Sequence, residues 1–230
     1  MKKDVHVIIT AAGKGLRFSK NKNAAKAKQF LTLNGKPVIL YSLLAFQKNK
    51  KVKSITVSAE PDKFNYLHSL AVKNKITKLT RLVEGGKTRF ESVQNAFNQL
   101  TCRVDDIVVI HDAARPNIPV SFINNFIDEA LKTGDVIPGI KVSETVKKCN
   151  KNAVIETIPR DELWLIQTPQ AFSYDTLSRS YIVAGKRTDF TDESSLAENA
   201  GYKVIVIGGY RFNIKITTAE DMTLLKKLMK

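Results

Sequence analysis

Short apolar runs alternate with amphipathic segments along most of the chain. The runs are rich in β-branched residues, which is typical of buried strands, and they lie at 5–10, 53–59, 79–83 and 106–110. The segments between them carry apolar residues at helical spacing, and these predicted helices lie at 38–47, 64–72 and 91–100. Strands that alternate with helices indicate a parallel sheet covered on both faces. We therefore expect an α/β fold with a mostly parallel, twisted sheet.

The alternation continues after residue 120. Ser121 is predicted to cap a helix that carries Phe122, Phe126 and Ile127 on its apolar face. Near the C-terminus we expect a helix at 192–199, strands at 204–207 and 214–216, and a last helix at 219–229.

Residues 142–157 break this pattern. Two segments of mixed polar and apolar residues flank Asn150-Lys151-Asn152, which is typical of a β-hairpin. An isolated hairpin is unstable in water, so such an arm usually docks on another surface. We expect residues 141–160 to form a β-arm that projects from a single domain, residues 1–230, and serves in homodimer formation.

Composition narrows the class of protein. The 230 residues, 43% hydrophobic and 26% charged, suit a globular protein with a full core. No apolar run approaches the roughly 18 residues of a membrane span, and the chain enters its first strand too early for a signal peptide. The two cysteines, Cys102 and Cys149, are too few and too far apart for a disulfide framework or a zinc site. We expect a cytoplasmic protein that does not bind membranes.

The net charge of +15 raises the question of nucleic-acid binding. The lysines are scattered, however, and no helix-turn-helix, zinc-finger or aromatic RNA-binding pattern lies among them. We therefore expect no nucleic-acid partner, because anionic small molecules suit the charge equally well.

The loop after the first strand is built from small residues: Ala11, Ala12, Gly13 and Gly15. Glycines leave backbone N–H groups exposed, and a row of such groups binds anions. Arg17 and Lys28 add two positive charges, so the stretch predicts a nucleoside triphosphate site. It matches neither the dinucleotide fingerprint nor the Walker loop, and a tight turn with solvated lysines is the alternative interpretation.

Asp112 and Arg115 lie where a strongly apolar strand ends, at the sheet edge where ligands of such folds bind. Asp112 is a candidate Mg²⁺ ligand, or else a turn or capping residue. Arg115 is suited to a phosphate, or else pairs with Asp112. His111 directly follows the apolar strand, so we expect it to be packed and hydrogen-bonded rather than catalytic.

Four further polar residues have both a functional and a structural interpretation. Arg160, at the base of the arm, is either a phosphate ligand across a dimer interface or part of a surface salt bridge. Thr168 either binds an anion or ends a strand before proline. Thr191 begins a segment typical of a helix N-terminus, which either binds an anion or serves only to cap the helix. Lys215, inside a predicted strand and pointing away from its apolar neighbours, favours a ligand.

Several short motifs occur in order between residues 5 and 225: Ala11 to Arg17, Lys28-Gln29, Gly35-Lys36-Pro37, Gly85-Gly86, His111 to Pro116, Thr168-Pro169-Gln170, Thr191 to Ser194 and Asn213-Ile214-Lys215. Together they resemble the 2-C-methyl-D-erythritol 4-phosphate cytidylyltransferases of the non-mevalonate isoprenoid pathway. The resemblance implies a Rossmann-like nucleotidyltransferase fold and a homodimer. It also implies Mg²⁺-dependent transfer of CMP from CTP to methylerythritol phosphate, with release of pyrophosphate.

The resemblance also implies roles for single residues. The CTP-binding set is Ala11, Ala12, Gly13, Gly15, Gly86, Ser92 and Asp112, with Asp112 also holding Mg²⁺. The catalytic residues, which neutralise the triphosphate, are Arg17 and Lys28. The set that binds methylerythritol phosphate is Arg115, Thr168, Thr191 and Lys215, with Arg160 from the second subunit.

Two positions depart from the family pattern. Ala27 stands where proline usually precedes the lysine, and Phe212 replaces an acidic residue that helps with the metal. An aromatic residue at that position is typical of the sister family, the ribitol-5-phosphate cytidylyltransferases, whereas three other motifs favour methylerythritol phosphate. Two alternatives of another class are a non-catalytic nucleotide- or nucleic-acid-binding protein on the same scaffold and a nucleotide-sugar glycosyltransferase.

Overall fold

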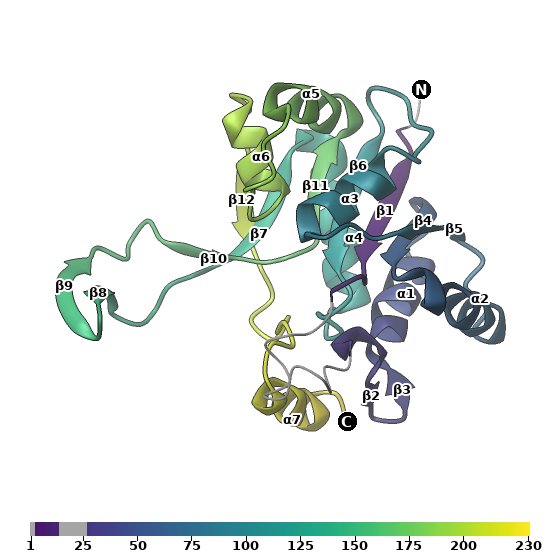
Figure 1. Cartoon of the computed structure of the whole chain (residues 1–230), viewed down its shortest axis with the longest axis horizontal. Coiled ribbons are helices and arrows are strands. Elements are labelled where there is room, and N and C mark those ends of the chain that lie inside the picture. The colour runs from purple at the N-terminus through teal and green to yellow at the C-terminus, as the bar shows by residue number, and fades with distance from the viewer. Residues whose placement is uncertain (1–2, 14–26) are drawn as a thin grey trace.

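The computed structural model describes residues 3–13 and 27–230. Its centre is an eight-stranded sheet with the order β10-β7-β11-β6-β1-β4-β5, in which β12 also pairs with β7 (Figure 1). Strands β1, β4, β5 and β6 run parallel, as do β7 and β12, whereas β10 and β11 run antiparallel to their neighbours. The strands are β1 Val5–Thr10, β4 Val52–Ala59, β5 Leu79–Glu84, β6 Ile107–Asp112, β7 Val136–Lys141, β10 Trp164–Ile166, β11 Gln170–Ser173 and β12 Ile205–Gly208.

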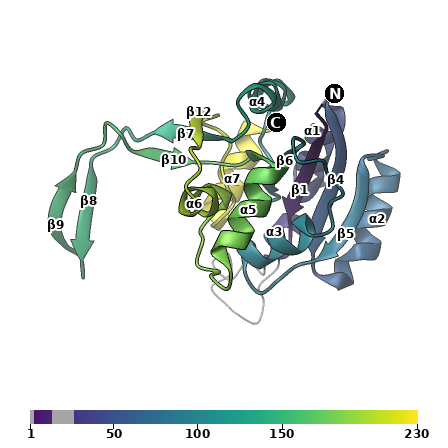
Figure 2. The ribbon, with the colours of Figure 1, turned by 90° about the horizontal axis from the view of Figure 1, so that it is seen from above.

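Helices cover both faces of the sheet, as the view from above shows (Figure 2). Alternate residues of β1 reach the two sides, because side chains of a strand point to opposite faces. Val7 and Ile9 pack with α1, α2 and α4, whereas Ile8 packs with α3, α5 and α6. The helices are α1 Val38–Lys48, α2 Phe64–Lys73, α3 Arg89–Phe97, α4 Val120–Thr133, α5 Tyr174–Ala184 and α6 Glu193–Asn199. The predicted α/β fold with a mainly parallel sheet is confirmed.

The remaining elements close the end of the sheet at which β1 and β6 finish. The 3₁₀ helix η2 (Lys28–Phe30) leads into the small hairpin of β2 (Thr32–Leu33) and β3 (Lys36–Pro37). The last helix, α7 (Ala219–Leu228), packs on this hairpin through a separate apolar cluster that includes Leu33 and Leu225. A second 3₁₀ helix, η3 (Pro61–Lys63), precedes α2.

Two sequence predictions about elements are wrong. Ser121 does not cap α4, because the backbone carbonyl of Pro119 already accepts the first helical hydrogen bond, from the N–H of Ile123, and the helix begins at Val120. Residues 214–216 are not a strand, since the segment is irregular and the N–H of Ile216 bonds to the oxygen of Ala114 in a turn beyond β6. The short strands β7, β10 and β11 were not predicted.

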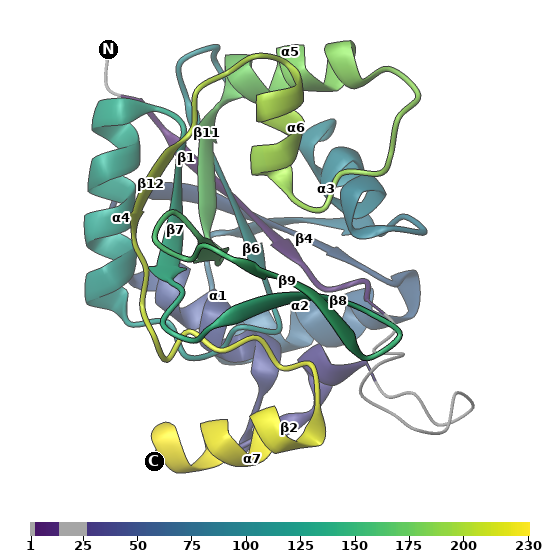
Figure 3. The same ribbon diagram turned by 90° about the vertical axis from the view of Figure 1, so that its left-hand side faces the viewer.

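The predicted hairpin is confirmed and projects from the body of the protein (Figures 1 and 3). It consists of β8 (Val146–Asn150) and β9 (Ala153–Ile158), which among the described residues pair only with each other. The turn residues Lys151 and Asn152 have φ values of 43° and 70°, as a tight hairpin turn requires. Val154 and Ile155 are 62% and 57% exposed on the arm.

Among the described residues, no helix combines the length and the apolar character needed to cross a membrane.

Candidate functional site

The loop after β1 is held against its surroundings by backbone and side-chain hydrogen bonds. Ala11 and Ala12 are buried, and the N–H of Ala11 donates to Ser58 on β4 at 2.7 Å. The Gln29 amide donates to the backbone oxygens of Ala11 and, at 3.0 Å, Gly13. Gln29, which the sequence marked only as part of a motif, therefore fixes the shape of the loop. Gly15 and Arg17, predicted for this loop, lie outside the described residues.

The loop before α3 packs directly on the loop after β1. A Cβ on Gly85 would lie 2.1 Å from the Cβ of Ala12, so only glycine fits there without movement. The N–H of Gly86 donates to the Ser92 hydroxyl at 3.0 Å. The structure thus brings Gly86 and Ser92, predicted from the resemblance, beside the alanines of the first loop.

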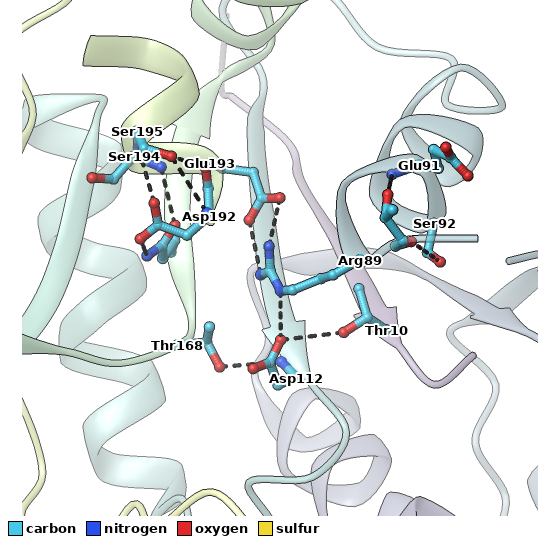
Figure 4. A network of polar contacts seen from close by, with 12 residues as sticks. Thr10, Arg89, Glu91, Ser92, Asp112, Thr168, Asp192, Glu193, Ser194 and Ser195 are labelled. Atoms are coloured by element: carbon cyan, nitrogen blue, oxygen red, sulfur yellow. Dashed lines mark hydrogen bonds and ion pairs between the residues drawn. The ribbon is translucent and has the colours of Figure 1, made fainter. Parts of the chain in front are cut away.

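Asp112 ends β6 within a ring of donors (Figure 4). Its Oδ1 accepts from Arg89 Nε at 3.0 Å and from the Thr10 hydroxyl at 3.3 Å, and its Oδ2 accepts from Lys215 Nζ at 2.5 Å. Burial alone would raise the pKa of Asp112, but Arg89 and Lys215 hold it well below its ordinary value. The carboxylate therefore stays ionised at any pH near neutrality.

Arg89 joins Asp112 to a second buried carboxylate. Its Nη1 and Nη2 donate to Oε1 and Oε2 of Glu193 at 2.8 and 2.9 Å, and Glu193 is 1% exposed. Burial would lower the pKa of Arg89, but Glu193 and Asp112 raise it, so the guanidinium stays charged. Arg89 is the first residue of α3 and Glu193 the first of α6, so the pair links two helices that cover the same face of the sheet.

Sequence reasoning gave neither Arg89 nor Glu193 a role. Arg89 follows the predicted Gly85-Gly86 motif, and Glu193 lies within the Thr191 to Ser194 motif. No local pattern relates two residues so far apart in the chain, and only the fold brings them together.

Thr168 and His111 form a buried pair behind Asp112. The Thr168 hydroxyl accepts from the N–H of Asp112 at 3.1 Å and lies 3.2 Å from Nδ1 of His111. His111 is fully buried, and burial is the main cause that lowers its pKa to about 4. The prediction that His111 is packed and hydrogen-bonded is confirmed.

Three other cationic candidates, Arg115, Lys215 and Lys28, differ in the contacts that they make. Arg115 donates through Nη1 to the backbone oxygen of Asn213 at 2.7 Å, and its buried Nε has no partner among the described residues. Lys215 reaches Asp112 although it is not in a strand. Lys28 begins η2, whose N-cap is Ala27.

Thr191 and Arg160 lie in exposed segments. Thr191 precedes α6, whose N-cap is Asp192. The Asp192 carboxylate accepts from the N–H of Ser195 at 3.0 Å. The predicted helix start is therefore confirmed. Arg160, at the base of the arm, donates to the backbone oxygen of Ser143. Within the described residues no hydrogen bond or ion pair joins Arg160 to Asp112, so the structure does not bring these two side chains together.

Asp112 is the candidate Mg²⁺ ligand, and its surroundings allow a test of fit. Mg²⁺ prefers carboxylate and phosphate oxygens and is commonly held by one or two carboxylates plus substrate phosphates. Asp112 supplies a hard, ionised oxygen of this kind. Its Oδ2 accepts from the partly exposed ammonium group of Lys215 rather than from the backbone, so a cation of higher charge can replace that contact. The donor set fits the ion.

Comparisons with known proteins agree with one another. The sequence profile described as "IspD: 2-C-methyl-D-erythritol 4-phosphate cytidylyltransferase" matches residues 5–230. The chain is 35% identical to the 2-C-methyl-D-erythritol 4-phosphate cytidylyltransferase of Halalkalibacterium halodurans, over 97% of this chain and 96% of that protein. It is 35% identical to the protein of that name from Geobacillus kaustophilus, over 96% and 95% of the two chains.

Solved structures give the same result. A crystal structure of 4-diphosphocytidyl-2C-methyl-D-erythritol synthase superposes with a TM-score of 0.84 at 26% identity, covering all of both chains. The 2-C-methyl-D-erythritol 4-phosphate cytidylyltransferase of Francisella tularensis superposes with a TM-score of 0.79 at 32% identity, covering 96% of this chain and 98% of that one.

Proposed function

The chain belongs to the 2-C-methyl-D-erythritol 4-phosphate cytidylyltransferase family, and from this premise we propose how its residues transfer the cytidylyl group of CTP to 2-C-methyl-D-erythritol 4-phosphate. The reaction serves isoprenoid synthesis and makes the protein a nucleotidyltransferase. The observation that carries the site assignment is the meeting of the two small-residue loops, around Ala12 and Gly86, beside the cation-rich surroundings of Asp112.

CTP occupies the two loops. Small residues there leave backbone N–H and C=O groups open to the cytosine and the phosphates. The N–H of Gly86 donates to the hydroxyl of Ser92, so the two groups are neighbours and can contact the same base. The proposed CTP-binding residues are Ala11, Ala12, Gly13, Gly15, Gly86, Ser92 and Asp112.

The methylerythritol phosphate lies on the other side of Asp112. Its phosphate is met by Arg115, whose buried Nε is without a partner among the described residues, and by Lys215 once that ammonium leaves Asp112. Thr168 and Thr191 complete this set from the loops before β11 and α6, and Arg160 joins it from the second copy of a homodimer.

The chemistry needs positioning and charge rather than a protein nucleophile. An oxygen of the substrate phosphate, already ionised, attacks the α-phosphorus of CTP in line, and pyrophosphate leaves. Arg17 and Lys28 offset the charge that builds on the α-phosphate in the transition state. His111 is not a base in this scheme, because it is buried and neutral.

Mg²⁺ bound by Asp112 together with the phosphates of CTP would neutralise charge on the triphosphate and so favour the departure of pyrophosphate. Arg89 and Glu193 hold Asp112 in its orientation from the side away from Lys215. We also retain two expectations that rest on the sequence, homodimer formation through the arm and a cytoplasmic location.

Pyrophosphate release with CTP and Mg²⁺ tests the assignment. Methylerythritol phosphate should be preferred over ribitol 5-phosphate, since the family of the chain acts on methylerythritol phosphate. Lys28→Ala should abolish turnover, whereas Lys48→Ala, on the exposed end of α1, should not change it. Retention of more than about a tenth of the activity in Lys28→Ala would contradict its charge-stabilising role.

A further inference from the structure

Three side chains that commonly bind metals meet at the end of the sheet opposite the nucleotide loops. His6 lies near the start of β1, and Cys102 and Asp106 lie in the segment between α3 and β6. One ligand atom from each residue lies within 4.8 Å of the others. Because β1 and β6 run parallel from here toward Thr10 and Asp112, the cluster is separated from the Asp112 site by the length of both strands (Figure 1).

His6 presents a buried nitrogen that the rest of the described chain leaves without a partner. The residue is 5% exposed, its Nδ1 is 2.7 Å from the Ser54 hydroxyl, and its Nε2 has no hydrogen bond. Nε2 faces Oδ2 of Asp106 at 3.8 Å, too far for a hydrogen bond. An orphaned buried nitrogen requires an explanation. A histidine whose second ring nitrogen is fixed by an oxygen is the usual arrangement in metal sites.

Asp106 is held by several hydrogen bonds, but the oxygen that faces His6 can still accept one more partner. Its Oδ1 accepts from the N–H of Asp4 at 2.9 Å and from Arg103 Nη2 at 2.7 Å, and its Oδ2 accepts from the N–H of Arg103 at 2.8 Å. Each carboxylate oxygen has two lone pairs, so Oδ2 retains one for a cation. Hydrogen bonds of this kind orient the carboxylates of metal sites.

Cys102 supplies the third ligand and the route to solvent. Cys102 is only partly buried. It lies on an irregular segment, so its sulfur can move closer to His6 and Asp106 by the roughly 1 Å that metal bonds of about 2.0–2.3 Å require. Burial and the neighbouring Asp106 raise the pKa of its thiol to about 12, so a bound metal displaces the thiol proton to solvent. A divalent ion is then neutralised by one thiolate and one carboxylate.

We propose that His6, Cys102 and Asp106 form a binding site for a borderline-soft divalent cation of the zinc type, with water as the fourth ligand. One sulfur, one nitrogen and one oxygen ligand suit such an ion and do not suit Mg²⁺. The two cysteines, counted alone, had excluded a zinc site. The fold instead brings Cys102 beside His6, which lies near the N-terminus of the chain. The ion joins the segment before β6 to the start of β1.

Titration of the full chain with Co²⁺ tests this site, because a thiolate ligand gives cobalt a charge-transfer absorption and a tetrahedral site gives strong ligand-field bands. The chain should carry Cys149→Ser, so that the exposed thiol on the arm does not contribute. We expect one Co²⁺ per chain with both absorptions, and their loss on addition of Zn²⁺. Cys102→Ser should remove the charge-transfer band and weaken binding at least about tenfold.

Two further variants separate loss of the metal site from loss of folding, and separate this site from the proposed Mg²⁺ ligand Asp112. His6→Gln should lose the tetrahedral bands while circular dichroism shows a folded chain, and Asp112→Asn should keep every cobalt band. If the charge-transfer band survives Cys102→Ser, or if Co²⁺ gives only the weak absorption of oxygen ligation, the proposal is wrong. Either result would leave the proposed cytidylyl transfer untouched.

Discussion

Arg89 is the residue on which the charge balance of the site depends. Asp112 faces Arg89 and Lys215, and Glu193 balances the far side of Arg89. A half-buried cation between two carboxylates is held at a fixed position, because movement toward one carboxylate weakens the hydrogen bonding to the other. Arg89 therefore keeps Asp112 oriented while Lys215, which is 32% exposed, is the member that can exchange its contact.

Glu193→Gln tests this positioning role. Glutamine keeps one hydrogen bond to Arg89 but loses the charge, so Arg89 should pull more strongly on Asp112 and compete with Mg²⁺. We expect kcat/KM to fall at least about tenfold, with a higher Mg²⁺ concentration for half-maximal rate. The measurement is steady-state pyrophosphate release across a Mg²⁺ titration.

The matched control is Glu198→Gln, a carboxylate on the exposed side of the same helix that accepts from Ser194. It should leave the Mg²⁺ titration unchanged. An identical Mg²⁺ titration for Glu193→Gln and the parent chain would remove Glu193 from the positioning of Asp112.

Gly85→Ala tests the contact between the two loops that we propose to bind CTP. The new methyl group would lie 2.1 Å from the Cβ of Ala12 and would push the loops apart. We expect a loss of about 1–3 kcal/mol in the free energy of unfolding and a KM for CTP that rises more than kcat falls. Gly208→Ala is the control, since a Cβ there meets nothing within 4 Å. Equal KM values in the two variants would contradict the close approach.

At the scale of the elements, α3 matters because its first turn carries Arg89 and Ser92. The Thr88 hydroxyl accepts from the N–H of Glu91 at 3.1 Å and caps this turn. Thr88→Ala should lower the free energy of unfolding by about 1 kcal/mol and also raise the KM for CTP. Chemical denaturation and initial-rate kinetics measure the two effects.

Ser121→Ala provides the comparison, because Ser121 has the residue type of a cap but stands inside α4 rather than before it. Its removal should change the free energy of unfolding by less than about 0.5 kcal/mol. A loss as large as that of Thr88→Ala would show that Ser121 stabilises the helix start after all.

Most elements were predictable because their apolar period is a local property. The strands at β1, β4, β5 and β6 and the hairpin at β8 and β9 follow from alternation and turn residues alone. Residues around Lys215 mimic a strand pattern, but their backbone runs past the turn after β6 rather than beside another strand. The Arg89–Glu193 pair was not predictable, since it arises only from the packing of α3 and α6.

At the scale of the whole molecule, the described residues form a body and an arm that lies clear of it (Figure 2). Arg160 lies between β9 of the arm and β10 of the body and donates to the backbone oxygen of Ser143. A dimer that crosses arms would bring Arg160 of one copy to the site of the other. Residues needed for one reaction would then be supplied by two chains.

Mixing two inactive variants tests this arrangement. Arg160→Ala and Lys28→Ala chains, each inactive alone, should regain part of the activity when mixed, because a mixed dimer has one site with both residues intact. Pyrophosphate release after co-refolding measures the rescue, and a sample of each variant refolded alone is the control. Mixed dimers without activity would place the complete site within one chain.

If the arm serves in a dimer, part of the fold becomes subject to mass action. Within the described part of the chain the two strands of the arm pair only with each other, and its apolar side chains Val154 and Ile155 are exposed, so the hairpin gains little from its own body. If a second copy covers it, its stability depends on protein concentration. Amide hydrogens at 146–158 would then exchange faster on dilution, while those of β1 and β6 would not change.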